Sequence, residues 1–156
     1  MRTRVPVAAL LVLVLSVLVL PAAAGAAPPV SGSGTFTVSS AVTTSTRLAD
    51  GNTVLTLRVT TLYSGTLQGT GVGEETVIVH PDGTLNGRTF ETFTGTIGGT
   101  VGTVVVRVEG TGDVTTGGLR GRLTIVDGTG GLATLHAEGT FQAIGDSGTY
   151  SVMSSL

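Results

Sequence analysis

Stretches of alternating apolar and polar residues, separated by turn signals, recur along the chain from residue 34 to its C-terminal end. Successive side chains of a β-strand point to opposite faces of a sheet, so this alternation predicts strands with one buried face. Threonine and valine favour strands and the 25 glycines favour turns, whereas no segment gives an amphipathic helix. The pattern predicts an all-β domain of eight strands, near residues 34–47, 53–63, 66–80, 84–97, 100–109, 118–126, 135–143 and 148–153.

The alternation also assigns the two faces of each strand. In the second expected strand, Leu57, Val59 and Tyr63 share one face, while Arg58 and Thr60 share the other. One apolar face on nearly every strand fits an antiparallel β-barrel with a packed or ligand-sized interior. A two-sheet sandwich shows the same alternation, but short connections between consecutive strands favour the barrel. The residues expected to line its interior and bind a ligand are Leu55, Leu57, Val59, Tyr63, Phe93, Val106 and Phe141.

The N-terminal segment has the pattern of a secretory signal peptide. Arg2 and Arg4 precede an apolar run at residues 5–20, and small residues follow it. A cut after Ala26 fits this pattern, with a cut after Ala24 as the competing site. A transmembrane anchor would need a longer uninterrupted apolar run. The protein is therefore expected to be secreted, with a signal peptide at 1–26, a flexible leader at 27–33 and a single β-barrel domain at 34–156.

Charge and cysteine content exclude several classes of partner. The chain has no cysteine, so an exported form depends on core burial and strand pairing rather than on disulfides. Removal of Arg2 and Arg4 leaves six of the eight basic residues against ten acidic ones, and no lysine is present. A nucleic-acid-binding protein needs a basic face to displace counterions from phosphates. The composition thus argues against nucleic acid, a polybasic membrane-binding surface and stable membrane insertion after cleavage.

Motifs for a metal or a cofactor are lacking as well. The two histidines, His80 and His136, have neither cysteines nor clustered carboxylates around them, so no zinc spacing arises. No Gly-x-Ser-x-Gly elbow of a serine hydrolase occurs. The glycine-rich residues 69–73 resemble a phosphate loop but lack a lysine and a following helix, and we interpret them as a flexible or bulged strand segment. The expectation is a protein without metal or cofactor.

Glu91 is the best single candidate for a catalytic residue. It alternates with Phe93 and Ile97, which places it on their inward face. A carboxyl group in an apolar interior suits acid or base chemistry, because burial disfavours its charged form. The alternative is a glutamate that pairs with an arginine or faces solvent, if a bulge at Gly87 shifts the register. Of the adjacent glutamates at 74–75, one must point inward and one outward, and the sequence leaves open which.

Several motifs occur in an order that resembles a known family. They are Gly-Thr-Phe-Thr-Val at 34–38, Pro-Asp-Gly-Thr at 81–84, Glu-Thr-Phe-Thr-Gly-Thr-Ile-Gly-Gly at 91–99, and Gly-Thr-Gly-Gly-Leu at 128–132. The sequence resembles small uncharacterised bacterial proteins with an allene-oxide-cyclase-like barrel, a calycin-type fold shared with plant allene oxide cyclases and dirigent proteins. The resemblance covers about residues 34–150. It implies an eight-stranded barrel and a homo-oligomer, and one such fold hosts unrelated functions.

Three hypotheses about function follow. The first is a secreted module that binds a small apolar molecule inside the barrel. The second is a cofactor-independent cyclase or isomerase of the allene-oxide-cyclase type, with Glu91 as acid or base. The third is a dirigent-like or structural surface protein with a filled barrel. The interior distinguishes them: a void above roughly 300 Å³ supports a ligand site, a void lined by an ionisable pair supports the enzyme, and a filled barrel supports the third.

Overall fold

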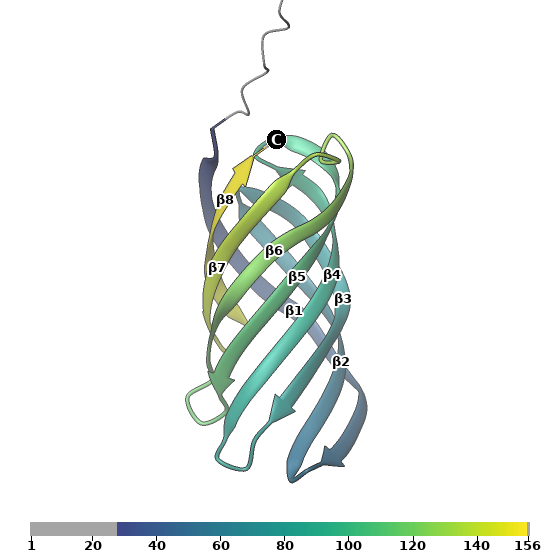
Figure 1. Cartoon of the computed structure of the whole chain (residues 1–156), viewed down its shortest axis with the longest axis vertical. Helices are drawn as coiled ribbons and strands as arrows, with labels where there is room; N and C mark the ends of the chain where they lie inside the picture. Colours follow the sequence, from purple (N-terminus) through teal and green to yellow (C-terminus); the bar gives the residue numbers. More distant parts are fainter. Residues whose placement is uncertain (1–27, 156) are drawn as a thin grey trace, which may run out of the picture.

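The computed structural model describes residues 28–155, which form one antiparallel sheet of eight strands (Figure 1). The predicted signal peptide lies outside these described residues. The eight antiparallel strands are confirmed, and none of the described residues is helical. The strands are β1 (Val30–Ala49), β2 (Asn52–Gly65), β3 (Leu67–Val79), β4 (Thr84–Ile97), β5 (Thr100–Asp113), β6 (Gly118–Gly130), β7 (His136–Ile144) and β8 (Ser147–Ser155).

The sheet closes on itself. Each strand pairs with the next one along the chain, and β1 also pairs with β8, so the strand order forms a closed barrel. The upper end of the barrel in Figure 1 contains both described chain ends and the β2–β3, β4–β5 and β6–β7 connections. The other four turns lie at the lower end. We call the first the terminal end and the second the hairpin end.

Three strands are longer than the sequence pattern indicates. β1 begins at Val30, within the segment expected to be a flexible leader, because residues 30–33 pair with β8. β5 continues to Asp113 and β6 to Gly130, so the glycine-rich stretches near residues 110 and 127 lie within strands instead of forming turns. Gly110 pairs with Gly121 there. These glycines sit in the sheet because Phe141 occupies the space that a Cβ at either position would need.

Residues 69–73, expected to be flexible or bulged, form a regular part of β3. They pair without any register shift with both β2 and β4. Their glycines replace side chains on the inward face rather than break the strand. A Cβ at Gly71 would overlap the carboxylate of Glu91, so the glycine is required by close approach.

The terminal end of the barrel is filled by a hydrophobic core. Phe93, Leu67 and Leu132 are at most 1% exposed, and they pack in one cluster with Val104 and Tyr150. The Tyr150 hydroxyl accepts a hydrogen bond from the backbone amide of Leu67 at 2.8 Å. It also lies 3.0 Å from the carbonyl oxygen of Ser64, to which it donates. This core closes one end of the barrel.

The seam between β1 and β8 covers only the first part of β1. β1 pairs with β8 only over residues 30–37, and the amide of Val38 then donates to the carbonyl oxygen of Asp146 at 2.7 Å. From Ser40 onward β1 pairs with β2 alone, with register shifts after Val38 and after Thr43. The ring is therefore less completely closed at the hairpin end.

Candidate binding cavity in the barrel

A cavity of about 200 Å³ lies inside the barrel, on the hairpin side of the core. Its lining extends to Asp146 in the β7–β8 turn, beside the short seam. Most of the wall is apolar, and the aromatic rings of Phe36 and Phe141 pack edge to face there, with their centroids 5.9 Å apart. Because the opposite end is filled, a small molecule would enter from the hairpin end.

Glu91 points into this cavity and is 4% exposed. The hydroxyl of Thr61 donates to its Oε1 at 2.7 Å, and the hydroxyl of Tyr63 donates to its Oε2 at 2.7 Å. Both carboxylate oxygens thus accept a hydrogen bond from a neutral side chain of β2. No register shift interrupts β4, so the alternation with Phe93 predicts the orientation of Glu91 correctly. The alternative of an arginine partner is not what the structure shows.

The phenol of Tyr63 is held in its neutral form by the same contacts. Burial, and then the adjacent Glu91 carboxylate, raise the pKa of Tyr63 well above its usual range. Its ring also packs edge to face against Phe93 at 5.7 Å between centroids and contacts Phe36 at 6.3 Å. Tyr63 therefore links the filled core, the cavity wall and the buried carboxylate.

Glu75 provides a second carboxyl group in the cavity. It lies on β3 opposite Thr89 and diagonal to Glu91, whereas its neighbour Glu74 is exposed on the outer face. Burial, reinforced by the negative charge of Glu91, raises the pKa of Glu75, and the hydroxyl of Thr89 opposes this shift. The structure thus answers which of the two adjacent glutamates points inward.

The cavity contains carboxyl groups but no basic side chain. No arginine or histidine is among the residues that line it. Four of the arginines lie instead on the outer face of β4, β5 and β6. Arg88 and Arg107 lie 2.9 and 3.8 Å from the carboxylate of Glu109. Arg120 and Arg122 are exposed. The negative charge inside the barrel has no countercharge from the described part of the chain.

The residues expected to line the interior and bind a ligand fall into three groups. Val59, Tyr63 and Phe141 line the cavity. Phe93 and Val106, at 0% and 1% exposure, belong to the filled core, so the expectation that they line the cavity is wrong. Leu55 and Leu57 on β2 are partly exposed and do not line the cavity.

Sequence reasoning missed two buried polar residues of the cavity, Thr61 and Thr89, and left the orientation of Glu75 open. Thr61 and Thr89 are 3% and 6% exposed. Alternation contained the signal for the threonines, since Thr61 lies between Val59 and Tyr63 in the same inward row. Their inward orientation was not recognised, because threonine is also the commonest outward residue of these strands.

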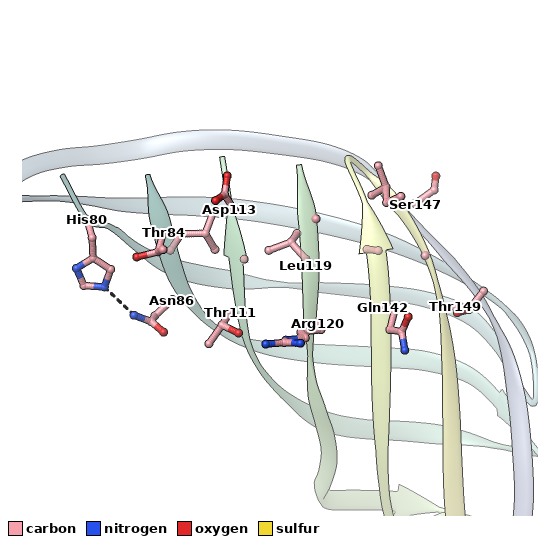
Figure 2. Close-up of a pocket in the computed structure, with 16 residues that line it drawn as sticks. His80, Thr84, Asn86, Thr111, Asp113, Leu119, Arg120, Gln142, Ser147 and Thr149 are labelled. Carbon is pink, nitrogen blue, oxygen red and sulfur yellow. Dashed lines mark hydrogen bonds between the residues drawn. The ribbon is translucent and has the colours of Figure 1, made fainter. Parts of the chain in front are cut away.

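Larger but open grooves cross the outer surface of the barrel. One of them follows β4 to β8 near the hairpin end and is lined by polar side chains such as Thr111, Arg120 and Gln142 (Figure 2). At its edge Nε2 of His80 lies 2.7 Å from Nδ2 of Asn86, and Nδ1 lies 2.9 Å from Oδ1 of Asn52. These contacts tie the β3–β4 turn to its neighbours. His80 thus has a structural role, and this groove is more open to solvent than the cavity inside the barrel.

Two further findings concern the described residues only. No group of three His, Cys, Asp or Glu residues in this part of the chain could hold a metal ion. Within residues 28–155, no helix is long and apolar enough to cross a membrane.

Fold and cavity together define a class: a small antiparallel barrel with a filled end, an open end and an acidic group buried between them. The chain belongs to the DUF3224 family, because the model of that family matches residues 32–153. The family is described by the words 'protein of unknown function'. A crystal structure of a DUF3224 protein of unknown function from Shewanella oneidensis MR-1 has a similar fold, with a TM-score of 0.68 and 18% identity over 81% of this chain and 96% of that one. Comparison with curated proteins found no match. Neither family nor structural match names an allene oxide cyclase, so the finer resemblance has no support from them.

Proposed function

We propose that this protein binds a small molecule inside its barrel, with the apolar wall as the main contact and Glu91 as the polar anchor. The observation that supports this most directly is the cavity of about 200 Å³ around a hydrogen-bonded, buried carboxylate. A cavity of roughly 150 Å³ accommodates benzene, whereas sites for drug-sized ligands begin at roughly 300 Å³. The ligand is therefore a small one, comparable to a single substituted ring.

The cavity can be tested with benzene as the probe, by following amide shifts in NMR spectra of the isotope-labelled protein. We expect saturable shifts confined to residues around the cavity, such as Val59 and Phe141. Gly87 also lines the cavity, and a Cβ there meets only Glu75 Oε1, at 3.2 Å. Substitution of Gly87 by alanine and then by valine should weaken benzene binding in steps, while Thr92→Val on the outer face of the same strand should not. Unsaturable or dispersed shifts would refute the binding function.

A second candidate function is a cofactor-independent cyclase or isomerase that uses acid–base chemistry. It is favoured by two carboxyl groups in one cavity, one fixed by two hydroxyl donors and one with a raised pKa. Such a pair can remove and return a proton at neighbouring positions of one substrate. Once a converted substrate is found, Glu91→Gln should abolish turnover while substrate binding persists. If Glu91→Gln loses only the ability to bind the substrate, the result would indicate a binding protein rather than an enzyme.

We also propose that the protein is exported, on the basis of its N-terminal sequence. The arginines, the apolar run and the small residues before position 27 have the order of a cleavable signal peptide. The secreted protein should begin near Ala27. N-terminal sequencing of protein from the culture fluid checks this, and an intact segment 1–20 on that protein would contradict it.

A further inference from the structure

We propose that the ligand is a small organic cation, whose positively charged ammonium group lies between Glu91 and Glu75. The inference rests on the proposed binding function and adds the charge and class of the ligand. It starts from the cavity as a whole, which combines an enclosed apolar volume, aromatic rings and carboxyl groups, with no basic side chain in its lining.

The first argument concerns the charge of the cavity. Glu91, Glu75 and Asp146 line it. Carboxylates that are buried in proteins are usually paired with a cation, since desolvation is costly otherwise. The two donors to Glu91, Thr61 and Tyr63, satisfy its hydrogen bonding but carry no charge. A cationic ligand would supply the missing countercharge.

The second argument concerns the aromatic part of the cavity wall. Phe36, Tyr63 and Phe141 contribute aromatic rings to the same cavity, with Phe36 in contact with both of the others. Aromatic faces attract ammonium groups, and they bind these most strongly where water is excluded. The combination of rings and carboxylates favours an alkylammonium ion over a neutral molecule of the same shape.

The third argument excludes an inorganic cation. Glu91 and Glu75 are the only acidic residues among the inner lining, with Asp146 exposed at the entrance, and no three candidate ligands converge within residues 28–155. Metal ions such as Ca²⁺ need six or more oxygen ligands. The apolar remainder of the cavity would be unfilled by an ion alone, whereas the hydrocarbon part of an organic cation would occupy it.

The test compares three probes of nearly equal shape: benzylammonium, benzyl alcohol and benzoate, titrated by calorimetry at neutral pH and low ionic strength. We expect benzylammonium to bind at least about tenfold more tightly than benzyl alcohol, and benzoate to bind too weakly to measure, because truncating or reversing one charge of a buried pair commonly costs a factor of ten or more. Benzylammonium binding should also weaken as salt is added.

Two variants locate the effect. Glu91→Gln should reduce the affinity for benzylammonium about tenfold more than it reduces the affinity for benzyl alcohol. Glu74→Gln is the matched control, since it removes the same charge from the outer face of the neighbouring strand and should change neither affinity. Glu75→Gln is the second interior variant, and it answers the same question if Glu91→Gln fails to fold.

The outcomes separate this inference from the proposed function. If benzyl alcohol binds as tightly as benzylammonium, the inference that the ligand is a cation is wrong, and the protein is a binding protein for neutral ligands. Failure of benzylammonium to bind overturns the cation in every case, and the benzene experiment then decides whether the cavity binds small molecules at all. An equal effect of Glu74→Gln and Glu91→Gln would show only long-range attraction and would also overturn the proposed site.

Discussion

Removal of a single oxygen atom tests the buried hydrogen-bond arrangement directly. In Tyr63→Phe the aromatic ring remains and only the hydroxyl that donates to Glu91 Oε2 is lost. Because Glu91 is 4% exposed, water does not readily replace this donor. Hydrogen bonds to charged groups contribute about 1.5–3 kcal/mol, and an unsatisfied buried acceptor costs a similar amount. We expect Tyr63→Phe to lower the free energy of unfolding by about 2 kcal/mol.

A double-mutant cycle with Glu91→Leu isolates the interaction between the two side chains. Glu91→Leu leaves the Tyr63 hydroxyl without its acceptor, whereas the double variant removes both partners. The loss in the double variant should therefore be smaller than the sum of the single losses by about 1.5–3 kcal/mol. Urea unfolding followed by far-ultraviolet circular dichroism gives the three free energies, and the dependence on urea should be unchanged. Additive losses, within about 0.5 kcal/mol, would refute the contact between Tyr63 and Glu91.

Three further predictions concern ionisation and packing. Both tyrosines of the chain have raised pKa values, mainly through burial, so the phenolate absorbance of the folded protein should rise only above the ordinary tyrosine pKa of about 10, and Tyr63 should ionise only when the protein unfolds; a rise in absorbance at or below about pH 10 would contradict this. The raised pKa of Glu75 means that its contribution to stability is fully present below its ordinary pKa of 4.5 and is lost as pH rises through the pKa of the folded protein. Glu75→Gln should therefore stabilise the protein at pH 7 but not at about pH 3. An effect of the same size at both pH values would contradict this. Val106→Asp should destabilise by more than about 3 kcal/mol and Thr103→Asp by less than about 1 kcal/mol in urea unfolding, and equal effects would mean that the inward face is misassigned.

The eight strands could be predicted because alternation and turns agree over most of the chain. In β4, Glu91, Phe93 and Ile97 keep one parity from end to end, and the structure shows no register shift there. A shift of one residue would reverse both faces, so an apolar row strongly determines the pairing. The second half of β1 lacks such a row, since residues 39–46 are mostly serine and threonine. Its bulges and its missing β8 partner could not be foreseen.

The sequence predicts which site residues face inward, but not at which level along the barrel axis they lie. Alternation places Tyr63, Phe93 and Val106 on inward faces, yet only Tyr63 lines the cavity. The level of a residue along the axis depends on how far neighbouring strands are staggered, and a period-two pattern contains no information about that stagger. Glu75 was ambiguous for a related reason: two adjacent glutamates satisfy either parity, and only the pairing with β2 and β4 selects one.

The inward glycines have a consequence for the divergence of related sequences. A Cβ at Gly34 would overlap the carbonyl oxygen of Ser64 and the ring of Tyr150, and one at Gly148 would overlap the carbonyl oxygen of Gln142 and the ring of Phe36. A smaller ring alone therefore does not make room for a side chain at either glycine. In an alignment of the family we expect Gly34 and Gly148 to stay glycine wherever the strand pairing is retained, while the aromatic partners vary in size. Interior shape can then drift between lineages, so proteins with the same fold need not share a ligand.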